Sequence, residues 1–69
     1  MEREYIGRAT INGLERTLKG TDRGAVMWAL RAVTETAAQL GWRVQDTSIT
    51  TRMRSSITGE YMGEATLRL

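Results

Sequence analysis

The chain contains nearly the same eight residues twice, as EYIGRATI at positions 4–11 and EYMGEATL at positions 60–67. Five of the eight positions are identical, and Arg8 of the first copy is replaced by Glu64 in the second. In both copies Tyr, Gly, Ala and an aliphatic residue alternate, which is typical of a strand with one apolar face. We therefore predict that the two copies are neighbouring strands in the middle of one sheet, with Arg8 next to Glu64.

A helix is predicted between the two copies, from about Asp22 to Leu40. Its apolar residues recur at helical spacing and form one stripe, which consists of Val26, Ala29, Leu30, Val33, Ala37 and Leu40. Thr21 or Asp22 can cap the first turn, and Gly41 suits the left-handed residue that ends a helix.

Asn12 and Gly13 lie between two strand-like runs, which is the pattern of a two-residue hairpin turn. Pairing outward from this turn places Ile11 opposite Leu14, Ala9 opposite Arg16, and Gly7 opposite Leu18. The alternative is a helical turn over residues 14–19, because Leu14 and Leu18 also suit the helical period.

A second hairpin is predicted after the helix, with Thr58, Gly59 and Glu60 as its loop. The resulting pairs keep apolar residues together: Ile57 with Tyr61, Met53 with Ala65, Thr51 with Leu67, and Ile49 with Leu69. Val44 is out of phase with Ile49, so a bulge or kink is expected between Arg43 and Ser48.

These elements predict a single α+β domain over residues 1–69, in which a four-stranded sheet (ββαββ) is covered on one face by a single helix to give two layers. The strand order would be 2-1-4-3, with a parallel central pair. If the chain is instead strand, helix, strand, strand, the central pair is antiparallel. Thr10 distinguishes the two, because it would neighbour Thr66 in the parallel pairing and Met62 in the antiparallel one.

Length and composition limit the classes of function. A domain of 69 residues is only marginally stable alone, so self-association is a natural support. The sequence has no cysteine and no histidine, which removes disulfides, thiolate metal sites and the usual general base. We therefore expect no metal, no cofactor and no enzymatic activity. The run from Ala25 to Leu40 contains Arg31 and Glu35, and the first residues lack an apolar signal core, so we expect a cytoplasmic protein without a membrane partner.

The formal net charge is +2, and nine of the ten basic residues are arginine. Arginine suits bidentate contact with phosphate or carboxylate, although the bias can equally reflect a GC-rich genome. The strand alternation collects the basic excess on the sheet face away from the helix. The basic residues predicted there are Arg8, Lys19, Arg52, Arg54 and Arg68, with hydroxyl donors from Thr10, Thr50 and Thr66.

No aromatic side chain is predicted on that face. Any nucleic-acid contact would therefore be made to the backbone and not to stacked bases. The alternative interpretation is a solvated sheet face with ordinary cross-strand charge pairs.

Three apolar residues are candidates for contact with a protein. Ile6 and Met62 are predicted side by side on the exposed sheet face, where they could support a sheet-to-sheet homodimer. Trp28 lies on the helix flank, where it either laps over the sheet edge or anchors an interface.

Trp42 follows the helix and is interpreted as closing the core. The residues Leu40–Trp42 (LGW), together with Glu60 and Tyr61 (EY), resemble the dodecins, which are small flavin-binding oligomers of strand, helix, strand, strand topology with a tryptophan after the helix. The likeness covers only those five residues, and the predicted helix is about one turn shorter. The first hairpin also departs from the dodecin pattern. The resemblance implies that Trp42 would stack on an aromatic ligand.

The leading functional prediction is a small, homo-oligomeric binding module without catalytic activity. It would recognise an acidic partner, nucleic-acid backbone first, through the Arg- and Thr-rich sheet face. The alternatives are a protein-binding adaptor or inhibitor, and a flavin-binding oligomer similar to the dodecins. The sequence does not distinguish among DNA, RNA and protein as the partner.

Overall fold

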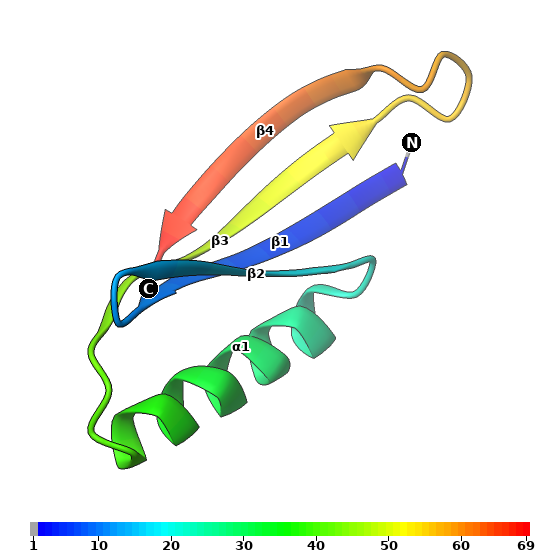
Figure 1. The fold of residues 1–69 in the computed structure, drawn as a ribbon. Helices are drawn as coiled ribbons and strands as arrows, with labels where there is room; N and C mark the ends of the chain where they lie inside the picture. Colours follow the sequence, from blue (N-terminus) through cyan, green and yellow to red (C-terminus); the bar gives the residue numbers. More distant parts are fainter. Residues whose placement is uncertain (1) are drawn as a thin grey trace.

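The computed structural model describes residues 2–69 and contains β1 (Glu2–Ile11), β2 (Leu14–Gly20), α1 (Arg23–Gln39), β3 (Val44–Arg54) and β4 (Tyr61–Arg68) (Figure 1). The strands form one antiparallel sheet in the order β2-β1-β3-β4. The α+β class and the succession of elements along the chain are therefore as predicted.

The first hairpin has the predicted turn and register. Asn12 and Gly13 have φ angles of 51° and 80°, as both central positions of a type I′ turn require. Ile11 pairs with Leu14, so residues 14–19 form a strand and not a helical turn. Asn12 also joins this turn to the segment after the helix. Its side chain accepts a hydrogen bond from the Arg43 backbone N–H at 3.0 Å, and its own N–H donates to the Arg43 carbonyl at 2.9 Å.

The ends of α1 lie close to the predicted bounds because both have their own stop signals. The Asp22 carboxylate accepts a hydrogen bond from the Gly24 N–H at 3.0 Å and caps the first turn. Gly41 has a φ of +78°, which is the left-handed conformation that ends many helices. Within residues 2–69, no helix is both long enough and apolar enough to cross a membrane.

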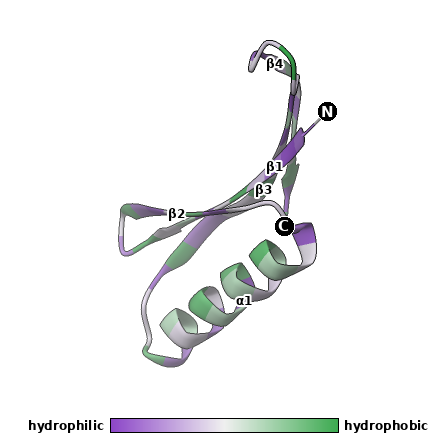
Figure 2. Ribbon diagram, turned by 90° about the vertical axis from the view of Figure 1, so that its right-hand side faces the viewer, coloured by the Kyte–Doolittle hydropathy of each residue, from purple (hydrophilic) through white to green (hydrophobic). Residues whose placement is uncertain are grey.

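The core lies between α1 and the β1–β2 half of the sheet. Figure 2 shows the helix on one side of the sheet, and within the described chain it contacts β1, β2 and β3 but not β4. The buried cluster consists of Ala9, Ile11, Leu30 and Ala37, with Leu18 and Val44 packed against it. Gly7 permits the close approach, because a Cβ atom there would lie 3.2 Å from Val26 Cγ1. The face of β4 on the helix side is consequently left without cover.

The predicted strand order 2-1-4-3 is wrong, because β3 and not β4 lies beside β1. Arg8 is opposite Ser48 of β3, whereas Glu64 is opposite Arg52. The β1–β3 ladder runs from Glu2 to Ile11. The antiparallel partner β3 spans 11 residues, so it satisfies more backbone groups of β1 than the 8 residues of β4 could. The two similar segments therefore flank β3 without touching.

Thr10 has neither of its predicted neighbours. It pairs with Glu15 of β2 and with Gln45 of β3. The bulge expected between Arg43 and Ser48 is confirmed. Ser48 pairs with Arg8 and Gln45 pairs with Thr10, so residues 46 and 47 of β3 lie opposite a single residue of β1. Asp46 in this stretch has a φ of 52°, and aspartate tolerates that left-handed conformation better than most residues.

The register predicted for the second hairpin is wrong by two residues. Met53 pairs with Gly63 and Ile49 pairs with Leu67, because the connection spans residues 55–60 and not 58–60. The Ser55 N–H donates to the Glu60 carbonyl at 2.9 Å, which closes this longer loop. A shift of two residues keeps the side chains of residues 63–68 on their predicted faces.

Candidate functional site

The sheet face turned away from α1, here called the outer face, carries the five basic residues predicted for binding. These are Arg8 of β1, Lys19 of β2, Arg52 and Arg54 of β3, and Arg68 of β4. The same alternation brings four acidic residues to this face, Glu2, Glu4, Glu15 and Glu64. These four carboxylates offset most of the five positive charges, so the positive excess of the outer face is smaller than the basic residues alone suggest.

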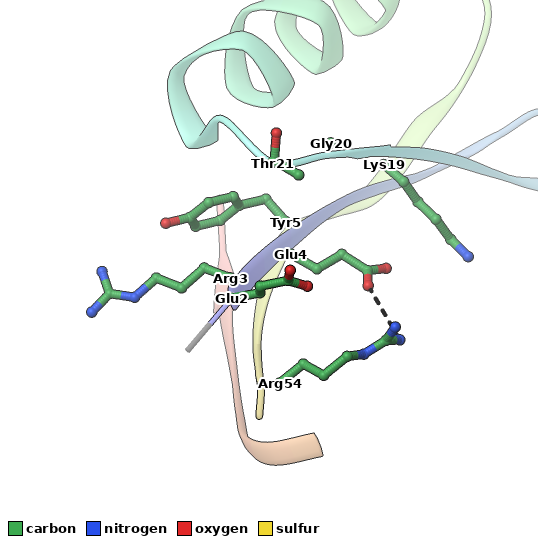
Figure 3. A pocket seen from close by; sticks show the side chains of 8 residues that line it. All are labelled: Glu2, Arg3, Glu4, Tyr5, Lys19, Gly20, Thr21 and Arg54. Atoms are coloured by element: carbon green, nitrogen blue, oxygen red, sulfur yellow. Dashed lines mark ion pairs between the residues drawn. The ribbon is translucent and has the colours of Figure 1, made fainter. Parts of the chain in front are cut away.

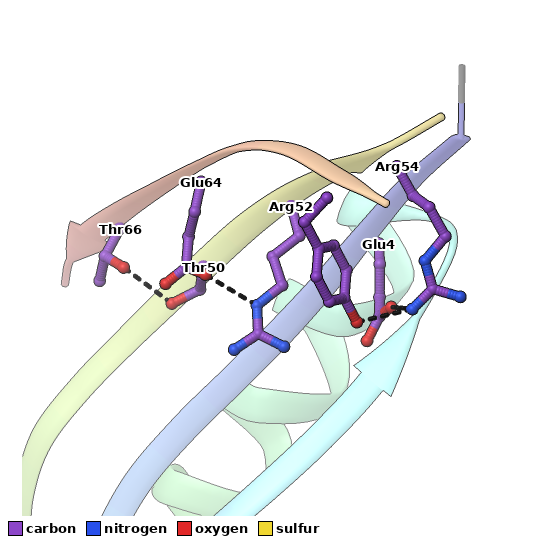
Figure 4. A network of polar contacts seen from close by, with 7 residues as sticks. Glu4, Thr50, Arg52, Arg54, Glu64 and Thr66 are labelled. Atoms are coloured by element: carbon purple, nitrogen blue, oxygen red, sulfur yellow. Dashed lines mark hydrogen bonds and ion pairs between the residues drawn. The ribbon is translucent and has the colours of Figure 1, made fainter. Parts of the chain in front are cut away.

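Two of the five basic residues are occupied by partners within the chain (Figure 4). Arg52 Nε donates to the Glu64 carboxylate at 2.9 Å. Arg54 Nη2 donates to the Tyr61 hydroxyl at 2.6 Å and lies 3.9 Å from the Glu4 carboxylate. The Tyr61 ring centre lies 5.2 Å from the guanidinium carbon of Arg52 and 4.7 Å from that of Arg54. These contacts hold both guanidinium groups against the sheet.

The environment of Arg52 favours its charged form. Its pKa is raised above the ordinary value, first by the Tyr61 hydroxyl and then by the Glu64 carboxylate, while partial burial opposes the shift. The Tyr61 hydroxyl also accepts the hydrogen bond from Arg54 Nη2, so one phenol interacts with both arginines. Arginine is charged at all physiological pH values anyway, and the raised pKa therefore reflects a fixed set of partners and not a proton switch.

The prediction that the outer face lacks an aromatic residue is wrong. A register shift between Met53 and Arg54 sets Arg54 opposite Tyr61, which makes Met62 the extra residue of a bulge. The regular hairpin assumed from the sequence would have placed Tyr61 on the helix side. The sequence signal that could have predicted a longer, irregular connection is the serine and threonine content of residues 55–60. The side chains of Ser55 and Thr58 accept hydrogen bonds from backbone N–H groups of this loop.

The predicted contact between Ile6 and Met62 is also wrong. Strand β3 separates their strands, and Ile6 is only 1% exposed, so its side chain is not available to a partner. Its neighbours in the register are Lys19 and Thr50. Thr50 is 0% exposed, and its hydroxyl lies 2.9 Å from that of Thr66. The middle of the outer face is therefore a small second core with one satisfied hydroxyl pair.

One row across the outer face combines basic and hydroxyl side chains without an acid. This row, here called the basic row, consists of Thr17, Arg8, Ser48 and Arg68 on successive strands. Arg8 lies 3.9 Å from Glu15, as far as Arg54 lies from Glu4, but unlike Arg54 it makes no side-chain hydrogen bond within residues 2–69. Arg68 has no ion pair in the same part of the chain. Lys19 is exposed and occupies the next row. The cations that remain open to a partner are therefore Arg8, Arg68 and Lys19.

A groove opens at the start of β1 (Figure 3). Its volume is about 890 Å³, and its lining comprises Glu2, Arg3, Glu4, Tyr5, Lys19, Gly20, Thr21 and Arg54. The acidic and basic side chains in it nearly balance, and Arg54 and Glu4 already contact each other. This balance disfavours a strongly charged small ligand at the groove.

The two tryptophans are more exposed than a core role requires. Trp28 is 74% exposed on α1, so it does not lap over the sheet edge, and an interface role remains a prediction. Trp42 is 50% exposed and lines a shallow hollow of about 330 Å³ with the apolar flank of α1. It therefore closes the core only in part, and stacking on a flavin stays a prediction.

Within residues 2–69, no three acidic side chains gather in a way that could hold a metal ion. Asp46 lies in the bulge of β3 and Glu60 in the loop before β4; both are exposed and they are not opposite each other in the register, so they do not form the kind of carboxylate pair that acid–base catalysis uses. No protein-family model, curated protein or solved structure matches the chain.

Proposed function

We propose that this chain is a small binding module without catalytic activity that recognises an acidic partner, nucleic-acid backbone first, through the outer face. The observation that carries the proposal is the basic row, in which Arg8 and Arg68 lie on either side of Ser48 with no carboxylate between them. Guanidinium and hydroxyl groups are the side chains that most often contact phosphate oxygens.

The spacing of the two arginines supports contact with a polynucleotide. Arg8 and Arg68 are two strands apart, which corresponds to about 10 Å at the usual strand spacing. Three nucleotides rise by about the same distance along one strand of a duplex. The two guanidinium groups can therefore reach phosphates a few nucleotides apart, and Lys19 adds a third cation at the β2 edge.

The paired arginines have a supporting role in this proposal. Arg52 pairs closely with Glu64 at 2.9 Å, and Arg54 is held by its 2.6 Å hydrogen bond to Tyr61 and lies 3.9 Å from Glu4. Both are therefore less free than Arg68 and Lys19 to turn toward an anion. Their contacts with Tyr61 fix the far end of the face. Within residues 2–69, Tyr61 is the one aromatic of the outer face; it is 51% exposed and flanked by two guanidinium groups. One aromatic offers at most one stacking site, so we expect mainly backbone contact.

Titration of a generic labelled duplex by fluorescence anisotropy, between about 50 and 200 mM salt, tests the proposal. Each phosphate contact contributes about −0.9 to the slope of log affinity against log salt. Arg8→Gln with Arg68→Gln should therefore make the slope shallower by about 1.8. The matched control is Arg23→Gln with Arg31→Gln on α1, which should leave the slope unchanged. Absence of binding at low salt, or an equal loss in the control, would contradict the proposal.

A protein partner is the second candidate, and the exposure of Trp28 favours it. A tryptophan that is 74% exposed on a regular helix is the kind of residue that anchors protein interfaces. Saturable binding of one protein that is lost in Trp28→Ala, with no affinity for duplex, would support an adaptor or inhibitor in place of the nucleic-acid module.

A further inference from the structure

The two edge strands of the sheet carry the same pattern of outer-face side chains. In β2 the order is Glu15, Thr17, Lys19, and in β4 it is Glu64, Thr66, Arg68. Each edge therefore presents an acid, a hydroxyl and a base at alternate positions. When two such strands run antiparallel, each acid lies opposite a base.

The open backbone groups of both edges belong to these same residues. The Leu69 N–H donates to the Thr47 carbonyl at 2.9 Å. The backbone N–H and C=O groups of odd-numbered residues at this end of β4 therefore point toward β3. Glu64, Thr66 and Arg68 consequently direct their N–H and C=O groups outward, because the direction alternates along an antiparallel strand.

The same alternation holds for β2. Its two-residue turn makes Ile11 and Leu14 a hydrogen-bonded pair. The backbone groups of Leu14 and of every second residue after it therefore point toward β1. The backbone groups of Glu15, Thr17 and Lys19 point to the open edge. Unpaired groups of this kind are a template for another strand.

We propose that β2 of one copy of this chain pairs antiparallel with β4 of a second copy, so that molecules associate head to tail. The register sets three outer-face pairs: Glu15 with Arg68 of the second copy, Thr17 with its Thr66, and Lys19 with its Glu64. The full length of β2, Leu14–Gly20, is matched by residues 63–69. The bulge at Met62 falls just beyond the last pair, where it does not disturb the ladder.

The apolar residues left exposed on the helix side fit the same arrangement. Leu67 of β4 and Leu69, which follows β4, are 52% and 55% exposed. Within residues 2–69, α1 does not contact β4, and Leu69 only borders a hollow beside α1. A hollow of about 720 Å³ lies between β2 and α1, and Leu14, Val33 and Trp42 are among its lining residues. Adding β4 of a second copy to β2 places its two leucines over this hollow, so that both apolar surfaces are covered together.

Two symmetric pairings also match charges but leave apolar surface uncovered. Self-pairing of β4 about Thr66 would set Glu64 opposite Arg68, yet no helix lies under either β4 strand to cover Leu67. Self-pairing of β2 about Thr17 leaves β4 free altogether. Head-to-tail pairing satisfies both edges, and it produces a closed ring or an open filament according to whether the rotation closes.

A charge-swap cycle tests the proposal, with molar mass measured by sedimentation velocity and light scattering in the absence of nucleic acid. Head-to-tail pairing predicts that Glu15→Arg and Arg68→Glu each weaken association by about tenfold, because each sets like charges opposite each other. The double variant should recover wild-type association, since it restores opposite charges in the same place. Glu35→Arg on α1 is the matched control and should associate like the wild type.

Each competing arrangement gives a different pattern and overturns the proposal. Self-pairing of β4 predicts that Arg68→Glu alone disrupts association and that the double variant stays disrupted. Self-pairing of β2 predicts the same with Glu15→Arg as the disruptive change. A wild-type chain that stays monomeric up to its solubility limit also overturns it. The proposal does not depend on the proposed function, because the mass is measured without a polynucleotide.

Two proline variants give an independent readout. Thr17→Pro removes an outward N–H from β2, and Arg68→Pro removes one from β4, so neither breaks a hydrogen bond of the ladder within the chain. Each variant alone should be monomeric, and their mixture should form a one-to-one heterodimer that does not grow. A dimer formed by either variant alone, or a mixture that stays monomeric while each variant keeps its circular dichroism spectrum, would refute head-to-tail pairing.

Discussion

Replacing Ile6 by alanine tests whether the outer face contains a packed core of its own. Ile6 is 1% exposed although it lies on the face away from α1. Truncating a buried isoleucine costs about 2–5 kcal/mol, because transfer free energy is lost and a cavity remains. A domain of this size has a free energy of unfolding of about 3–10 kcal/mol. We therefore expect Ile6→Ala to remove about 3 kcal/mol, a large part of the total.

Ile57→Ala is the matched control, because Ile57 is 94% exposed in the loop between β3 and β4. The free energy of unfolding of the Ile57→Ala variant should stay within about 0.5 kcal/mol of the wild type. In urea unfolding followed by tryptophan fluorescence, a loss of about 3 kcal/mol lowers the midpoint by about 2–3 M for a small domain. If Ile6→Ala unfolds at the same urea concentration as Ile57→Ala, Ile6 is not packed and the description of the outer face is wrong.

Three further substitutions probe single contacts through the free energy of unfolding. Asp22→Ala removes the helix cap and should cost about 1 kcal/mol, whereas Asp22→Asn should keep most of the stability; equal losses would contradict a capping role. Thr66→Val leaves the buried Thr50 hydroxyl without a partner and should cost about 1–3 kcal/mol, more than Thr50→Val does; the reverse order would count against the hydroxyl pair. Gly20→Ala would place a Cβ atom 2.9 Å from Val26 Cγ2, so it should cost about 1–3 kcal/mol, and less in a Val26→Ala background if this clash is the cause.

The parts of the fold that depend on residues close together in the sequence could be predicted from the sequence. Asn12 and Gly13 set the turn and therefore every pair of the first hairpin. Asp22 and Gly41 set the ends of α1 in the same way. The basic side chains were assigned to the correct face because the alternation of a strand survives even a register error of two residues.

The parts that depend on distant segments could not be read from the sequence. The likeness of residues 4–11 and 60–67 was interpreted as adjacency, but backbone pairing places β3 between them. Similar segments have similar exposure patterns, and this does not decide which strand lies beside which. The bulge at Met62 brought Tyr61 to the outer face, and the order of the strands set Ser48, and not Glu64, next to Arg8.

The neighbour of Arg8 decides whether the basic row exists, and disulfide trapping tests it most directly because the chain has no cysteine. Adjacent strands bring Cα atoms to within about 5.5 Å, whereas residues two strands apart are about 10 Å apart, which is too far for a disulfide. Mass spectrometry of the oxidised monomer should find a disulfide in Arg8→Cys with Ser48→Cys and free thiols in Arg8→Cys with Glu64→Cys. A disulfide between positions 8 and 64, with free thiols at 8 and 48, would contradict the strand order and the binding face inferred from it.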